Sequence, residues 1–182
     1  MSIYVEILIR APMDKIWEYT QTPQLHQQWD LRFSTIDYMP RTEIASPQCF
    51  RYATRIGCGL EIAGEGHTTA YRELPDGSAI SALEFASDSR LSLIRRGTGY
   101  WKYIPTRDGV RFITVYHYST RFGAFGARFD RSVFRPLIGW ATAWSFDRLR
   151  LWLEAGIHPR LALRRMLPSA GRCRRHPVRE TR

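Results

Sequence analysis

Hydrophobic and polar residues alternate over the first ten positions of the chain. A period of two residues predicts a strand that buries one of its faces. Ala11-Pro12 ends this strand, and two short helices are predicted over residues 12–21 and 22–30. The apolar positions of the strand are Ile3, Val5, Ile7 and Ile9.

Strand patterns separated by turn residues continue to residue 120. Pro75-Asp76-Gly77 and Arg107-Asp108-Gly109 are typical of tight turns. Both faces of the last strand are partly apolar, so the sequence leaves open whether Phe112 or Ile113 points inward. The predicted strands are 33–39, 49–56, 60–74, 79–86, 93–104 and 110–120.

The stretch Asp130–Gly156 has the period of one long helix with a wide apolar side. Asp147, Arg150 and Glu154 are expected on the opposite, polar side. Gly156 is predicted as the C-cap, and Pro136 fits a helix that becomes regular near Arg135. The apolar side contains Phe134, Leu137, Ile138, Trp140, Ala141, Trp144, Leu149, Leu151 and Trp152.

This order of elements predicts an α+β domain. Consecutive strands joined by short turns form an antiparallel meander. A curved sheet of about seven strands, wrapped around one long C-terminal helix, would bury every apolar face. The two short helices after strand 1 would close one end.

The net charge of +10 is concentrated near the end of the chain. Residues 157–182 hold eight arginines and one acid, so they carry +7 and leave +3 for residues 1–156. We therefore predict a domain over 1–156 and a basic, flexible tail over 157–182. The nearly balanced domain argues against nucleic acid as the partner.

Composition indicates a reducing, cytoplasmic location. No apolar run approaches the ~20 residues that span a bilayer, and the first residues lack a signal-peptide pattern. Cys49, Cys58 and Cys173 fit no disulfide set and no zinc spacing. The segment from Arg160 to Leu167 could form a short basic amphipathic helix, and we favour a disordered, solvated tail. The alternatives are peripheral attachment of this helix to an anionic membrane and, as a weaker one, contact with nucleic acid.

Several short motifs stand in the order that one superfamily shows. They are Ala11-Pro12-Met13-Asp14-Lys15-Ile16-Trp17 after the first strand, Pro23 and Trp29-Asp30 on the second short helix, Gly99-Tyr100-Trp101-Lys102-Tyr103, and the long final helix. Over residues 2–156 the chain resembles the START-like (SRPBCC) superfamily, which includes polyketide cyclase/dehydrase-like, lipid-transport and birch-pollen-allergen-like proteins. The resemblance implies a helix-grip fold that holds a hydrophobic ligand between sheet and helix, and it supplies no shared catalytic residue.

Aromatic residues make up 13% of the chain, and many fall on the predicted inner faces. They would line a cavity for a flat or lipid-like ligand; the alternative is a filled core, since aromatic side chains dominate cores. The candidate ligand-binding aromatic residues are Trp29, Tyr52, Phe85, Trp101, Tyr103, Trp140 and Trp144.

Ser145 and Arg148 are two polar residues within the apolar side of the long helix. A buried arginine requires a partner, and Arg148 could bind a ligand carboxylate with help from Ser145. Alternatively, Arg148 pairs with an acid of the sheet or extends to the helix edge. Glu61, Glu65 and His67 share one face of a strand, which we interpret as a solvated outer face.

The sequence predicts neither a metal nor another cofactor. The five histidines have no ligand spacing, and the chain contains no GxSxG, P-loop or dinucleotide-binding motif. Cys58 has no neighbour that would lower its pKa, so an inert thiol is expected. We therefore predict a module that binds a hydrophobic small molecule or lipid, as a monomer or homodimer. The alternatives are a cyclase/dehydratase-type enzyme using the same cavity and an interaction domain with a filled core.

Overall fold

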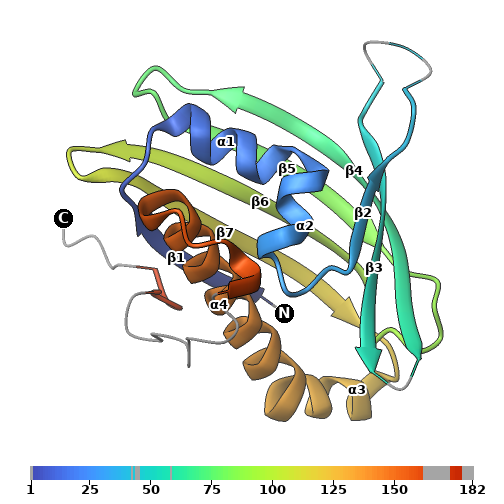
Figure 1. The fold of residues 1–182 in the computed structure, drawn as a ribbon. Helices are drawn as coiled ribbons and strands as arrows, with labels where there is room; N and C mark the ends of the chain where they lie inside the picture. Colours follow the sequence, from blue (N-terminus) through green and yellow to red (C-terminus); the bar gives the residue numbers. More distant parts are fainter. Residues whose placement is uncertain (1, 42, 44–45, 58, 162–172, 178–182) are drawn as a thin grey trace.

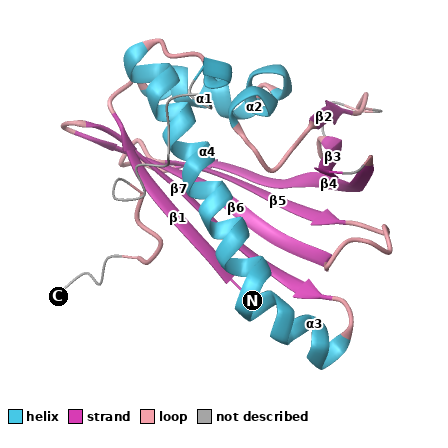
Figure 2. Ribbon diagram, turned by 60° about the horizontal axis from the view of Figure 1, so that its bottom comes forward, coloured by secondary structure: helices cyan, strands magenta, loops and turns pink. Residues whose placement is uncertain are grey.

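The computed structural model describes residues 2–41, 43, 46–57, 59–161 and 173–177, which form one curved sheet and the helices packed on it (Figures 1 and 2). The sheet has seven antiparallel strands in the order β1-β7-β6-β5-β4-β3-β2. Its strands are β1 (Ser2–Ile9), β2 (Thr35–Tyr38), β3 (Cys49–Gly57), β4 (Leu60–Glu73), β5 (Ala79–Ala86), β6 (Ile94–Thr106) and β7 (Gly109–Thr120). The α+β helix-grip prediction is confirmed, including the two short helices after strand 1, α1 (Met13–Gln21) and α2 (Pro23–Trp29).

The long helix begins earlier than the sequence predicts. It consists of α3 (Gly123–Phe129), a π-helical turn η1 (Asp130–Phe134) and α4 (Arg135–Ala155). Two glycines within α3 lower its helix propensity, so the pattern alone did not reveal it. Pro136 lies in the first turn of α4, and Gly156 ends the helix with a φ of 66°, both as predicted.

Aromatic side chains fill the half of the fold beneath α1, α2 and the second half of α4. The Phe146 ring of α4 stacks on Phe112 of β7, with ring centroids 4.5 Å apart. Trp29, Trp101 and Tyr103 complete this packed group, and none is more than 8% exposed. Phe112 therefore points inward, which answers the question that the sequence left open.

The polar side predicted for the long helix is wrong at two positions. Asp147 and Arg150 are 1% and 6% exposed, and Arg150 Nη2 lies 2.8 Å from Asp147 Oδ1. This side of α4 is covered because the chain returns to β1: Glu6 and Arg174 exchange two backbone hydrogen bonds of 2.8 Å. Cys173, next to that bridge, is buried and donates to the Ala143 carbonyl oxygen.

Cys173 is expected to be chemically inert in the folded protein. Burial raises the pKa of its thiol to about 12, so the reactive thiolate is scarce at pH 8. In a Cys49→Ser/Cys58→Ser variant, the remaining thiol should react with DTNB at least about a hundredfold more slowly in the folded protein than in urea. Equal rates in both states would show that residues 173–174 do not pack on β1 and α4.

Two further features of the fold bear on function. The solvated outer face is confirmed, because its three predicted residues lie in exposed ion pairs. Glu61 lies near Arg55, Glu65 near Arg51 and His67 near Glu84. No helix within the described ranges is both long and apolar enough to cross a membrane. The predicted basic helix falls mostly on residues 162–167, which lie outside the described residues.

Candidate functional site

Half-buried aromatic rings lie on the concave face over β3, β4 and β5. We call this the open half, because α4 packs against β1 at the other edge of the sheet. Tyr52 and Phe50 of β3 pack over glycines of β4, and Phe85 of β5 packs over Gly97 of β6. A Cβ atom at any of these glycines would collide with the ring, so the glycines let the rings lie close to the sheet. We call Phe33, Phe50, Tyr52 and Phe85 the aromatic floor; the Phe33 and Tyr52 ring centroids are 5.6 Å apart.

A buried carboxylate, Asp30, lies beside this floor at the end of α2. Arg32 binds it through two side-chain hydrogen bonds, Nε to Oδ1 at 2.9 Å and Nη2 to Oδ2 at 2.6 Å. His26 Nε2 is 3.0 Å from Oδ2, and Ser145 Oγ of α4 is 3.3 Å from Oδ1. Burial alone would raise the pKa of Asp30, but the charge and hydrogen bonds of Arg32, with those of His26, lower it far below its usual range. Asp30 is therefore ionised.

Arg32 joins the carboxylate to the aromatic floor. Its Cζ atom lies 5.3 Å from the centroid of the Phe33 ring and 5.6 Å from that of Tyr116. Its side chain is only 13% exposed. A guanidinium has five N–H donors. Asp30 engages two of them and the Tyr116 hydroxyl another, so donors remain that can bind a polar group of a ligand on the floor.

Ser145 and Arg148 lie at the contact between α4 and α2. The Ser145 hydroxyl accepts from the Leu31 backbone N–H at 2.9 Å and donates to the Ala141 carbonyl at 2.8 Å. Arg148 donates to the Gln28 carbonyl at 2.9 Å, and its buried Nε has no hydrogen-bond partner among the described residues. Burial lowers the pKa of Arg148, and the negative charge of Asp30 acts in the opposite direction. Arg148 thus holds the C-terminal end of α2, and Ser145 holds the loop that follows Asp30.

The predicted aromatic residues separate into three groups. Trp29, Trp101 and Tyr103 belong to the packed half of the core, whereas Tyr52 and Phe85 are half-buried on the open half. The ring centroids of Trp140 and Trp144 are 4.9 Å apart. At about 100° per residue they lie roughly 120° and 160° around α4 from Phe146, which faces the sheet. They therefore lie toward the back of α4, away from the aromatic floor.

Sequence reasoning did not select Asp30 and Arg32 as site residues. Their importance comes from contacts with Ser145 and Tyr116, which are distant in the chain. The one indication in the sequence was that the acidic residue Asp30 directly follows Trp29, the apolar last residue of the second short helix. A second buried carboxylate, Asp130, was likewise missed; it binds Tyr118 and Arg135 at the π turn.

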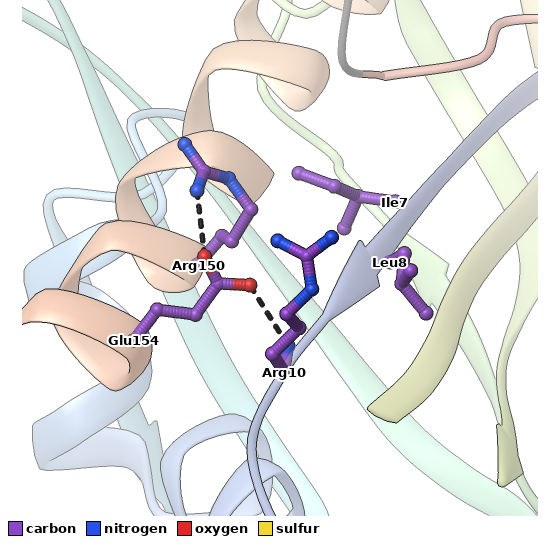
Figure 3. Close-up of a pocket in the computed structure, with 5 residues that line it drawn as sticks. All are labelled: Ile7, Leu8, Arg10, Arg150 and Glu154. Carbon is purple, nitrogen blue, oxygen red and sulfur yellow. Dashed lines mark hydrogen bonds and ion pairs between the residues drawn. The ribbon is translucent and has the colours of Figure 1, made fainter. Parts of the chain in front are cut away.

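A separate pocket of about 390 Å³ lies at the other edge of the sheet, between the end of β1 and α4 (Figure 3). Glu154 accepts hydrogen bonds from the Arg10 backbone N–H at 2.8 Å and from Arg150 Nη1 at 2.7 Å. The charged groups of Arg150 and Glu154 are thus engaged with each other and with β1. This arrangement joins strand to helix, and the described residues that line the pocket, Ile7, Leu8, Arg10, Arg150 and Glu154, include no aromatic ring.

Titratable side chains do not converge into a metal-binding arrangement in the part of the chain that the structure describes. Within those ranges, no group of three or more His, Cys, Asp or Glu side chains could hold an ion. His26 lies between the rings of Trp29, Phe33 and Trp101, and burial lowers its pKa despite its bond to Asp30. Its imidazole is therefore held inside the packed core.

Comparison with known proteins identifies the fold. No protein-family model matches the chain. A STAR-related lipid transfer protein from Xanthomonas axonopodis has a TM-score of 0.62 and 20% identity, covering 84% of this chain and 85% of that one. The ZhuI aromatase/cyclase from Streptomyces sp. R1128 has a TM-score of 0.60 and 10% identity, covering 86% of this chain and 97% of that one. The chain therefore has the helix-grip fold that these two proteins share.

A much stronger sequence likeness exists to a protein from Bacillus subtilis (strain 168), the uncharacterized membrane protein YndG. The two are 50% identical over 163 residues. The match covers 89% of this chain and 60% of that protein, so the chain spans about 60% of the length of its relative.

Proposed function

We propose that this protein binds a hydrophobic, partly aromatic small molecule on the aromatic floor, with Arg32 as the polar anchor. The observation that supports the proposal is the position of Arg32: Asp30 holds it rigidly against the rings of Phe33 and Tyr116. A preorganised arginine beside half-buried rings suits a flat molecule that carries a carboxylate, sulfonate or phenolate. The lipid transfer and aromatase/cyclase proteins that share the fold support a ligand of this class.

The test is a binding titration with two fluorescent probes. One is the anionic anilinonaphthalene sulfonate, and the other is the neutral phenylnaphthylamine. Replacing Tyr52 with Ser removes one ring of the floor and should lower the binding affinity for both probes by about tenfold. Replacing Arg32 with Lys keeps the charge but loses the bidentate bond to Asp30. The affinity for the anionic probe alone should then fall by about tenfold.

The matched control is Tyr100→Ser, which removes a ring from the outer face of β6, where Tyr100 is 36% exposed. It should leave both affinities unchanged. Thermal melts must show that each variant is folded, because a loosely packed protein binds such probes nonspecifically. Native mass spectrometry then identifies any compound that copurifies. Equal affinities for wild type, Tyr52→Ser and Tyr100→Ser would refute the floor as the site.

A polyketide cyclase/dehydratase-like enzyme is the second candidate, since an aromatase/cyclase shares the fold. Such chemistry requires a proton-transferring group in contact with the substrate. His26 is bound to Asp30 and enclosed by rings, which favours a positioning role for that pair. Binding is therefore proposed ahead of catalysis, and an interaction domain with a filled core would follow if no ligand is found.

We also propose that the protein acts in the cytoplasm, peripherally at a membrane. Its relative in Bacillus subtilis is named a membrane protein, and the positive net charge of +10 favours contact with anionic lipid.

A further inference from the structure

The helix that leads into α4 carries an exposed apolar stripe. From Phe125 onward its residues recur every four positions, so they lie along one side of the continuous helix formed by α3, η1 and the start of α4, and Phe122 directly precedes the first turn. This helix extends past the end of β7 and away from the sheet (Figure 2). The exposed side chains, which we call the docking stripe, are Phe122 at 60%, Phe125 at 75%, Phe129 at 43%, Val133 at 49% and Leu137 at 54%.

Phe122 is an unusual residue at its position. Its φ of 66° lies in the left-handed region, which disfavours bulky side chains and would suit glycine or asparagine. The ring is 60% exposed, so packing within the fold does not account for a phenylalanine here. A contact outside the chain would account for an outward-facing aromatic ring held at this unfavourable φ.

Positive charge surrounds the docking stripe. Residues 121–135 contain four arginines and one acid, Asp130, which is fully buried and bound by Arg135 and Tyr118. Arg128 and Arg131 are exposed on the same helix. The β5–β6 loop joins this end of the molecule, since the Arg121 N–H donates to the Leu93 carbonyl at 2.8 Å. That loop adds Leu91, which is 55% exposed, and one exposed residue of each charge, Arg90 and Asp88.

We propose that the docking stripe lies on the surface of an anionic lipid bilayer. Phenylalanine, valine and leucine side chains would enter the interface between headgroups and acyl chains, and Arg128 and Arg131 would bind lipid phosphates. Exposed apolar side chains flanked by Arg128 and Arg131, with the carboxylate of the same helix, Asp130, buried, complement this surface. The proposal deepens the peripheral location given above by naming the face that makes contact, and it does not depend on the ligand.

The experiment is cosedimentation of the full chain with vesicles of phosphatidylcholine, alone or mixed with phosphatidylglycerol. Wild type should bind the mixed vesicles, less tightly as salt rises. Phe122→Asn/Phe125→Ser should lower the apparent affinity by about tenfold. Arg128→Glu/Arg131→Glu should lower it by about thirtyfold or more, since each basic residue near the surface contributes about 1 kcal/mol.

Two controls change exposed residues far from the stripe. Arg107→Glu reverses a charge in the β6–β7 turn, at the opposite end of the sheet, and Tyr71→Ser removes a ring that is 51% exposed on β4. Tyr71→Ser should bind like wild type, and Arg107→Glu should bind within about twofold of it. All variants should melt at similar temperatures, because none of the changed side chains is buried.

The outcomes distinguish a failure of the proposed peripheral location from a failure of the docking stripe as the contact surface. If wild type does not bind mixed vesicles, the peripheral location and the docking stripe both fail. If wild type binds and the stripe variants bind equally well, another surface, such as the basic tail, makes the contact and the stripe proposal is wrong. If the stripe variants instead dissolve a dimer seen by sedimentation equilibrium, the stripe is an interface between two copies.

Discussion

Replacing Asp30 with Ala should destabilise the protein by about 3–5 kcal/mol, because it removes the partner of a buried charge. Arg32 would remain inside the fold with both of its short hydrogen bonds to Asp30 lost. His26 would also lose the carboxylate oxygen that lies 3.0 Å from its Nε2. The change in unfolding free energy can be measured by urea denaturation at pH 7, with the same slope expected for both proteins.

Asp37→Asn is the control, because Asp37 is an exposed aspartate on β2. Its unfolding free energy should stay within about 0.5 kcal/mol of wild type. A loss below about 1 kcal/mol for Asp30→Ala would mean that Arg32 is solvated and is not held by the carboxylate.

The same pair predicts the direction of the pH dependence. The pKa of Asp30 is lowered in the folded state, so its contribution to stability is complete above the unfolded pKa of about 4 and is lost as the pH falls below it. Wild type should therefore lose stability between about pH 4 and pH 2, and the difference between wild type and Asp30→Asn should shrink over that window. A constant difference would contradict the assignment of a lowered pKa to Asp30.

Replacing Phe146 with Ala should cost about 3–5 kcal/mol, the range for truncating a buried phenylalanine. The Phe146 ring is fully buried. Its centroid lies 4.5 Å from that of Phe112, on which it stacks, and 6.2 Å from that of Trp29, to which it is roughly perpendicular. The loss should appear as a lower urea midpoint without a change in slope.

Phe125→Ala provides the comparison for the same chemical change at an exposed site, since Phe125 is 75% exposed. It should alter the unfolding free energy by less than about 0.5 kcal/mol. If Phe146→Ala cost as little, the half of the fold beneath α1 and α2 would be a ligand cavity, and the ligand would need to be sought there instead of on the aromatic floor.

The fold could be predicted from the sequence because its main determinants are local. Alternation in β1, the turn at Pro75-Asp76-Gly77 and the Gly156 cap each depend on a few neighbouring residues. The order of these elements was then sufficient for an antiparallel sheet around a long helix. The helix start at Gly123 was not predictable in the same way, because its glycines oppose helix formation.

The candidate site could be predicted only in part. Aromatic content indicated rings on the concave face, and Tyr52 and Phe85 do lie on its open half. The pattern could not show that Trp29 and Trp101 would instead fill the core, since strand and helix periods identify a buried side but not what faces it.

The sequence by itself determined the element types, their order and the sheet-and-helix architecture. Only the tertiary structure decided that Asp30 anchors Arg32, that Asp147 and Arg150 are buried and that Phe125 remains exposed. These outcomes depend on contacts between distant segments, such as Ser145 with Asp30 across 115 positions. Local periodicity carries no information about such pairs, because each residue's environment is set by the element that folds against it.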